Sequence, residues 1–253
     1  MFDTHCHLDF PEFDADREHV LQHCRQLGLE GVLVPGVSAA SWSRLLALTD
    51  QHADLFPALG LHPMFIDEHR DEHLLELEKL LQADRAVALG EIGLDFFLPQ
   101  LDRLRQQHFF QAQLQLAVRY QLPVILHVRK AHDQVLSLLR QHRLPGGIVH
   151  AFSGSYQQAQ QYIELGFMLG FGGAMTWPRA TKLQSLAARL PLSSLVLETD
   201  APDMRPFGID SHRNSPEYLP QIASFLADLR GLDVAELRRV TTHNVRQAFF
   251  SRL

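Results

Sequence analysis

The stretch that decides the fold is residues 123–152, PVILHVRKAHDQVLSLLRQHRLPGGIVHAF. It opens with one apolar, β-branched run, Pro123–Val128, and closes with another, Gly147–Phe152. Between these runs, Ala131–Gln141 carries apolar residues at helical spacing. Two strands joined through a helix pair in parallel with a right-handed crossover, so this stretch predicts one βαβ unit.

The same alternation of apolar runs and helical segments continues on both sides of this unit. Further strands are predicted at Met1–Cys6, Gly31–Val37, Leu55–Leu61, Ala86–Ile92, Phe167–Gly173 and Ser194–Thr199. Further helices are predicted at Ala15–Leu27, Ala39–Asp50, Asp71–Ala83, Asp102–Tyr120, Tyr156–Leu165, Ala180–Leu190, Pro216–Leu229 and Val234–Phe250.

Eight strands that alternate with helices fit an open doubly wound sheet as well as a closed barrel. The number of strands and the length of 253 residues favour the barrel. The fingerprint G-x-G-x-x-G is missing after the first strand, which argues against a dinucleotide-binding sheet. We therefore predict an α/β protein, a (β/α)8 TIM barrel with one extra C-terminal helix. Since no linker or low-complexity tract interrupts the chain, residues 1–253 are expected to form a single domain.

Composition limits the protein's class and location. Hydrophobic residues make up 46% of the chain, enough for a sizeable core, and no run of 18 apolar residues predicts a membrane span. The N-terminus lacks the features of a signal peptide, and two cysteines make no disulfide framework, so a cytoplasmic protein is expected. A net charge of −6 does not suggest long duplex nucleic acid, but it permits a nuclease that holds a few phosphates near a metal.

Histidine is unusually frequent, with 15 residues. Neutral imidazole is the commonest protein metal ligand, although most surface histidines bind nothing. Four histidines lie among polar neighbours in the sequence and are predicted to be solvated: His69, His73, His132 and His142. Position in the fold must therefore identify the ones that bind metal.

Imidazoles and carboxylates follow five of the predicted strands. The first strand ends in Thr4-His5-Cys6-His7, where alternation in an extended segment puts both imidazoles on one side. Four other strand ends supply Glu91, His127, His150 and Asp200. Because the C-terminal ends of the strands form the active-site mouth of a TIM barrel, these six side chains are expected to meet there. Buried carboxylates without partners are costly and repel one another, so bound cations are the simplest explanation.

Six ligands are more than one tetrahedral ion needs, and a shared Glu91 would resolve the excess. One ion would then bind His5, His7, Glu91 and Asp200, and the other would bind Glu91, His127 and His150. We predict two divalent ions, with Zn, Mg and Mn as candidates. Two ions about 3.5–4 Å apart can activate a water and hold both the attacking and the leaving oxygen. Our hypothesis makes this water the nucleophile and makes Asp200, with the bridging Glu91, the catalytic carboxylates.

Motifs that share a known pattern run almost from end to end of the chain: Asp3-Thr4-His5-Cys6-His7-Leu8-Asp9, Gly60-Leu61-His62-Pro63, Gly90-Glu91-Ile92-Gly93-Leu94-Asp95, Leu126-His127-Val128-Arg129, His150-Ala151-Phe152-Ser153-Gly154-Ser155 and Glu198-Thr199-Asp200-Ala201-Pro202. With these motifs the chain resembles the TatD family of metal-dependent deoxyribonucleases in the amidohydrolase superfamily, and its YjjV-like branch in particular. The resemblance implies a (β/α)8 fold and the same six metal positions. It also implies that His62 and Arg129 line the site near a substrate phosphate. The family's frequent His-Ser-Arg-Asp-Ala reads His127-Val128-Arg129-Lys130-Ala131 here, a departure that bears on substrate preference.

Other polar and aromatic residues near the predicted mouth are expected to support the ligands or the loops. Glu198 lies two residues before Asp200 and is expected to support a ligand or water. For Asp95 and Asp203, a turn or helix cap is the favoured role. For the loop aromatics, packing is favoured over base stacking.

The leading interpretation is a hydrolase of phosphodiester bonds, with DNA or another phosphoester as a transient partner. No membrane or obligate protein partner is indicated. A hydrolase of carboxylic esters or amides, including an aminoacyl ester on RNA, is the alternative, because the same water attacks a carbonyl carbon. A third possibility is a metal-binding protein without catalytic activity.

Overall fold

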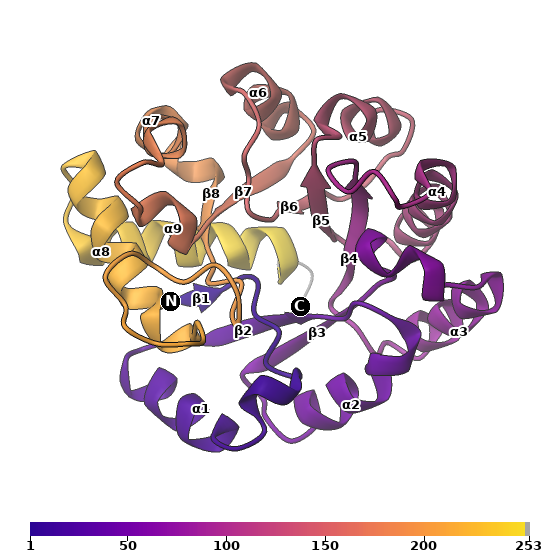
Figure 1. The fold of residues 1–253 in the computed structure, drawn as a ribbon, viewed down its shortest axis with the longest axis horizontal. Coiled ribbons are helices and arrows are strands. Elements are labelled where there is room, and N and C mark those ends of the chain that lie inside the picture. Colours follow the sequence, from indigo (N-terminus) through magenta and orange to yellow (C-terminus); the bar gives the residue numbers. More distant parts are fainter. Residues whose placement is uncertain (251–253) are drawn as a thin grey trace.

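A computed structural model describes residues 1–250 of the chain. Its eight strands form one parallel sheet in which each strand pairs with the next along the chain (Figure 1). The strands are β1 (Phe2–Asp3), β2 (Gly31–Pro35), β3 (Leu55–Leu59), β4 (Ala88–Asp95), β5 (Val124–Arg129), β6 (Gly147–Val149), β7 (Phe167–Phe171) and β8 (Leu195–Leu197). The sheet curls into a barrel, so the predicted TIM-barrel fold is confirmed.

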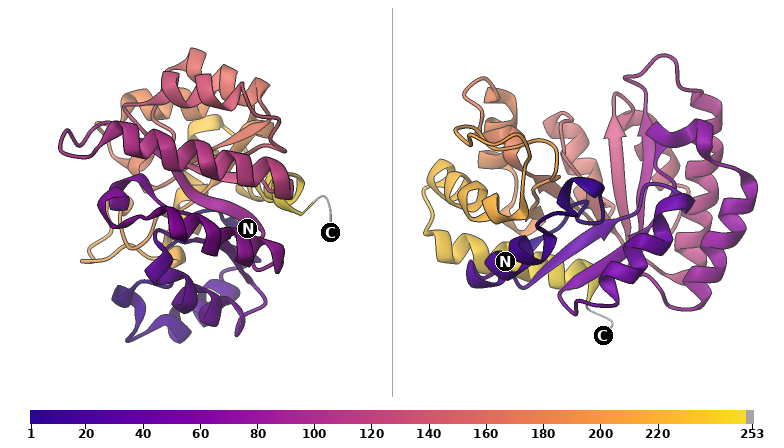
Figure 2. Two further views of the ribbon diagram at one scale, coloured as in Figure 1. Left: turned by 90° about the vertical axis from the view of Figure 1, so that its right-hand side faces the viewer. Right: turned by 60° about the horizontal axis from the view of Figure 1, so that its bottom comes forward.

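One α-helix follows each strand, and one more follows the last. The helices are α1 (Arg17–Gln26), α2 (Ala39–Thr49), α3 (Asp71–Gln82), α4 (Arg103–Tyr120), α5 (His132–Leu139), α6 (Tyr156–Glu164), α7 (Thr181–Arg189), α8 (Leu219–Arg230) and α9 (Val234–Phe249). Figures 1 and 2 show α1 to α8 around the outside of the barrel. The predicted elements are all present, and α9 is the predicted extra helix.

The barrel closes between the segments that follow β1 and β8. The backbone N–H of Asp200 donates to the carbonyl of His5 at 2.8 Å. The buried carboxylate of Asp3 accepts hydrogen bonds from the backbone N–H of Thr199 at 3.0 Å and from its hydroxyl at 2.5 Å. The first strand was predicted to reach Cys6, but ladder pairing with β2 ends at Asp3 because the chain then turns to these β8 contacts. Closure therefore places His5 beside Asp200.

Helix α9 covers the N-terminal end of the barrel, as Figure 2 shows from a tilted view. Val245 and Phe249 of this helix pack against apolar side chains that the strands point into the barrel. The strand residues of this cluster are Phe2, Leu33, Ala58, Ala88, Ile125, Ile148 and Val196. Since apolar packing fills this end, the polar strand ends at the opposite mouth are the part of the interior left for a site.

Two histidines that were predicted to be solvated are buried. Nε2 of His69 donates to the carbonyl of His62 at 2.9 Å, and Nδ1 of His132 lies 3.2 Å from the hydroxyl of Tyr162. Their neighbours in the sequence are polar, but their own side chains point inward between elements. Across residues 1–250, none of the helices has the length and apolar character to cross a bilayer.

Candidate metal centre

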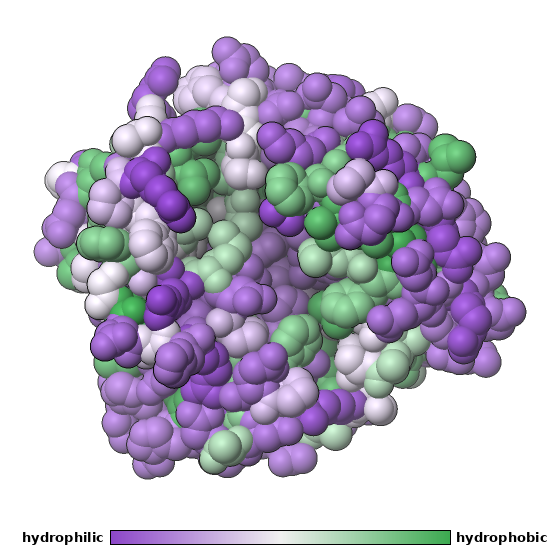
Figure 3. Space-filling view, viewed as in Figure 1, coloured by the Kyte–Doolittle hydropathy of each residue, from purple (hydrophilic) through white to green (hydrophobic). Residues whose placement is uncertain are grey.

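The six residues predicted to bind metal lie together at the C-terminal mouth of the barrel. Glu91 of β4 is at their centre and is only 1% exposed. Figure 3, viewed from the same side as Figure 1, shows the mouth as a hollow near the middle of this face, with apolar side chains around it. The two carboxylate oxygens of Glu91 face two different groups of side chains.

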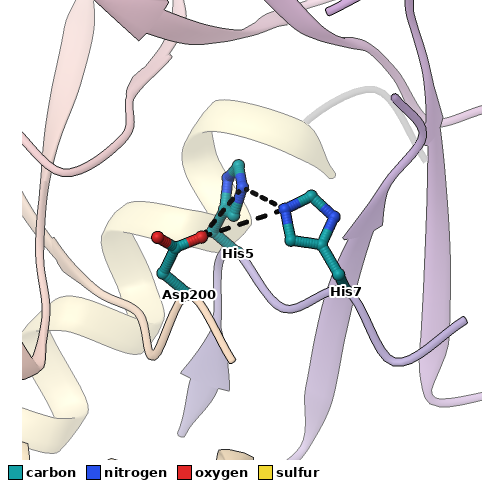
Figure 4. A group of neighbouring side chains, drawn as sticks. All are labelled: His5, His7 and Asp200. Atoms are coloured by element: carbon teal, nitrogen blue, oxygen red, sulfur yellow. Dashed lines mark hydrogen bonds and ion pairs between the residues drawn. The ribbon is translucent and has the colours of Figure 1, made fainter. Parts of the chain in front are cut away.

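The first group is formed by His5, His7 and Asp200, whose side chains point toward one another (Figure 4). Oε2 of Glu91 faces the two imidazoles of this group. Nε2 of His5 lies 3.0 Å from this oxygen and 3.3 Å from Nε2 of His7. Oδ1 of Asp200 lies 3.6 Å from Nε2 of His5 and 3.8 Å from Nε2 of His7. Two nitrogens and two oxygens therefore surround one point.

The second group faces Oε1 of the same carboxylate. Nδ1 of His127 lies 3.0 Å from Oε1, and Nε2 of His150 lies 3.7 Å from it. Nε2 of His62 also lies 3.1 Å from Oε1, so this histidine is inside the cluster and not at its rim. The structure thus brings the six residues together around Glu91. By ligand distance, His150 groups with His5 and Glu91, whereas His62 groups with His127 and Glu91, so the division of ligands between two ions remains part of the proposal.

The outward-facing ring nitrogens show which inward nitrogens carry a lone pair. Nδ1–H of His7 donates to the carbonyl of Pro35 at 3.2 Å, and Nε2–H of His127 donates to a carboxylate oxygen of Asp95 at 3.0 Å. A neutral imidazole has only one N–H, so the inward nitrogen of His7 is left as an acceptor and is prepared to bind a cation. Both nitrogens of His127 face carboxylates, Nε2 toward Asp95 and Nδ1 toward Glu91 at 3.0 Å; burial would lower its pKa, but these two contacts raise it. Asp95 thus orients His127 instead of acting as a turn residue alone.

His62 has the opposite arrangement. Its Nδ1 accepts the backbone N–H of Met64 at 3.1 Å, so the proton of the neutral ring is on Nε2. That inward N–H points at Glu91. His62 is therefore a hydrogen-bond donor within the cluster, which fits a role in holding an anion better than a role as a metal ligand.

Burial and mutual contact shift the pKa values of the cluster. Burial lowers the pKa of His7 to about 4 and that of His5 well below its usual range. Burial alone would raise the pKa of Glu91, but the surrounding imidazoles, first His62 and then His5, hold it well below its ordinary value. Burial alone would lower the pKa of His150, but the carboxylates of Asp200, Glu198 and Glu91 raise it to about 10, so a divalent ion bound here would displace a proton from this ring. Carboxylate oxygens together with imidazole nitrogens are a donor set of the kind that binds divalent transition metals. The residues present therefore fit the metal ions that the sequence predicts.

Left-handed backbone conformations are concentrated around the mouth. Among residues 1–250, six non-glycine residues have positive φ. Four of them follow barrel strands at this end: Lys130, Ala151, Asp200 and Met204. Such conformations are unfavourable for residues with a Cβ, and they persist where the surrounding structure holds them, often at functional sites.

Arg129, which was expected near a substrate phosphate, lies at the edge of the mouth. Its side chain is 46% exposed, and its guanidinium stacks 3.7 Å from the ring centre of Phe97. Nη1 lies 3.9 Å from the carboxylate of Asp95. The cation is thus fixed beside the second group of side chains while one face remains open to solvent.

Supporting residues on the neighbouring elements hold the cluster in place. Oε1 of Glu198 accepts the backbone N–H of Ala151 at 2.6 Å and lies 3.4 Å from Nδ1 of His150, the type of support that was expected of it. Gly170 leaves room for this carboxylate, since a Cβ there would lie 2.2 Å from Oε2. Glu198 therefore fixes the position of His150 from behind.

Two buried glutamines of α4 were missed by the sequence analysis. Gln113 accepts the backbone N–H of Leu61 at 2.7 Å and donates to its carbonyl at 3.2 Å. Gln106 makes the same pair of bonds to Asp95, at 2.8 and 3.0 Å. The two glutamines thereby fasten the chain next to His62 and the residue that orients His127. Their signal in the sequence is a seven-residue spacing on the helix face that otherwise carries apolar residues.

Comparison with known proteins agrees with this arrangement. The family model described as TatD related DNase matches residues 2–250. The chain belongs to the TatD family. An uncharacterized metal-dependent hydrolase, YjjV of Escherichia coli K12, is 44% identical over 98% of this chain and 97% of its own length. The crystal structure of that TatD homologue superposes with a TM-score of 0.94, at 43% identity over 98% of this chain and 97% of that one. A 3′-5′ ssDNA/RNA exonuclease TatD of Erwinia tasmaniensis is 36% identical over 98% of this chain and 99% of its own length.

Membership of the TatD family establishes the class of the protein. The chain is a metal-dependent hydrolase that acts on ester bonds. The possibility of a metal-binding protein without catalytic activity is thereby removed.

Proposed function

We propose that this chain is a TatD-type nuclease that cleaves phosphodiester bonds of DNA at a centre of two divalent ions. His5, His7 and Asp200 would hold one ion, His127 and His150 would hold the other, and Glu91 would bridge them. Bound divalent ions supply positive charge for the phosphoryl oxygens and make a water acidic enough to attack near neutral pH. The exonuclease relative from Erwinia tasmaniensis supports nucleic acid as the substrate.

The observation that carries this proposal is the position of Glu91. Its two oxygens each face a separate set of donors, at 3.0 Å from His5 on one side and 3.0 Å from His127 on the other. A carboxylate that only supported one ligand would turn one oxygen toward a backbone N–H or solvent. A bridging role explains why both oxygens point into the cluster.

The remaining residues supply proton transfer and anion binding. Asp200 is 16% exposed at the mouth, so its carboxylate is placed to accept a proton from a water that binds there. The inward Nε2–H of His62 and the guanidinium of Arg129 flank the second group and would donate to non-bridging phosphate oxygens. Binding and proton transfer are thus assigned to different side chains.

The same proposal includes the identity of the ions, which are Zn, Mg or Mn. It also includes a single domain over residues 1–253, and a location in the cytoplasm without an obligate protein partner. Of these three ions, a centre rich in imidazole favours Zn.

The test uses protein stripped of metal and reloaded with Mg, Mn or Zn, assayed on 3′-labelled single-stranded and duplex DNA and on p-nitrophenyl acetate. Wild-type protein should shorten DNA only when loaded, and Glu91→Gln should lose this activity together with one bound ion. Asp200→Asn should lower turnover much more than substrate binding. Cleavage of the carboxylic ester without cleavage of DNA would replace the nuclease by the ester hydrolase.

A further inference from the structure

A cavity of about 550 Å³ opens beside the candidate metal centre, within the range of about 300–1,000 Å³ that small-molecule sites occupy. His127, His150 and Asp200 line one end of it. From there it extends under the loops that follow β6, β7 and β8. A substrate whose scissile bond lies at the metal centre would therefore place a neighbouring group of the same molecule in the cavity.

The far end of the cavity is apolar. It is lined by Ala174, Met175, Leu183 and Met204. Leu183 is half-buried on α7, and Met204 is 40% exposed, so both offer surface to a ligand. Methionine side chains adapt to flat rings and make favourable contacts with them. The far end is thus suited to a planar, weakly polar group.

Positive charge lies at the lips of the cavity and not inside it. Arg129 lines one lip. On the other, Nζ of Lys182 donates to the carbonyl of Ser153 at 2.9 Å and stays exposed. Three acids also line the cavity: Glu198, whose carboxylate is turned toward the backbone of Ala151, Asp200 of the candidate centre, and the exposed Asp203. A ligand of matching chemistry has an apolar ring linked to an anion.

We propose that this cavity binds the nucleobase of the nucleotide that is cleaved from the strand. The inference rests on the proposed nuclease function, because a nucleotide joins a planar base to the phosphate that the centre would attack. The apolar wall contacts the face of the ring and does not read its edge, so all four bases are accepted. The cavity would seat the terminal nucleotide with its phosphate beside Arg129, at the divalent ions that Glu91 would hold.

The decisive comparison is between two single-stranded oligonucleotides that differ only in the 3′-terminal residue, which carries a base in one and none in the other. Burial of a ring-sized apolar group changes binding by roughly tenfold or more, so metal-loaded wild-type protein should remove the residue with a base at least about tenfold more efficiently. Equal rates on both oligonucleotides would overturn the proposal while leaving the nuclease intact. No cleavage of either, with a small phosphodiester still hydrolysed, would instead overturn the proposed nuclease function.

A cavity-filling substitution locates the effect. Leu183→Trp should reduce the preference for the residue with a base to about twofold or less, and Ala174→Trp should act in the same direction. Ser185→Trp, at an exposed position of the same helix, is the matched control and should keep the wild-type preference. Metal stoichiometry is measured on every variant to show that the centre is intact. A Leu183→Trp protein that binds its metals and keeps the full preference would place the base elsewhere and refute the assignment.

Discussion

The hydrogen bonds between Gln113 and the backbone of Leu61 give the sharpest test of how α4 positions the chain beside His62. The Gln113 side chain is completely buried, and its amide makes hydrogen bonds to both backbone groups of Leu61 and to the carbonyl of Phe109. Gln113→Met keeps nearly the same volume but removes the amide. The N–H and carbonyl of Leu61 then lose their partner, and each unpaired buried group costs about 1–3 kcal/mol. We expect the free energy of unfolding to fall by about 2–4 kcal/mol.

Urea unfolding followed by circular dichroism measures this change. Gln115→Met is the matched control, because Gln115 is exposed two residues further along α4 and should change stability by less than about 0.5 kcal/mol. If Gln113→Met unfolds at the same urea concentration as the control, the amide makes no net contribution. The conclusion that α4 fastens the chain beside His62 would then be wrong.

Three other perturbations test the centre and the buried histidines. His127→Ala should lose one of two bound ions, whereas His62→Ala should keep both ions and lower turnover by roughly tenfold or more. Elemental analysis measures the bound metal and steady-state kinetics measure the turnover. Equal loss of metal from both variants would show that His62 is a metal ligand and not a hydrogen-bond donor. Removal of metal should lower the melting temperature, because the carboxylates of Glu91 and Asp200 then lack their cations, and reloading should restore it. Calorimetry measures this change. An unchanged melting temperature would contradict the assignment of the cluster as a metal site. Burial lowers the pKa of His132 to about 4, below the 6.5 of the unfolded chain. The unfolded state therefore binds more protons than the folded state between pH 6.5 and 4, so the free energy of unfolding falls as the pH drops through this window. His132→Gln should make this fall about 1–3 kcal/mol smaller. If both proteins lose the same stability over this range, His132 is not buried in its neutral form.

The sequence contains enough to predict the barrel and the residues that gather at its mouth. Strand–helix alternation is a local pattern, and the strand ends of a TIM barrel share one face, so the meeting of His5, Glu91 and Asp200 follows from the count of strands. Two features could not be predicted from the local sequence, because they depend on tertiary contacts. The protonation pattern of His62 depends on the N–H of Met64 in the next loop, and the burial of His69 depends on helix α4 packing over it. Neither partner is visible in the local pattern around those histidines.

The closure of the barrel determines when, during synthesis, the centre can exist. His5 is synthesised before β2, whereas its neighbour Asp200 follows only after seven more strands. At translation speeds of about 5–20 residues per second, tens of seconds separate the two, allowing roughly 10–40 s for the intervening chain. A ribosome-bound fragment that ends before β8 presents His5 and His7 without the carboxylate that completes their group. With Asp200 as a ligand of the centre, as proposed, we expect such a fragment to lack hydrolase activity until the last strand of the barrel has been added.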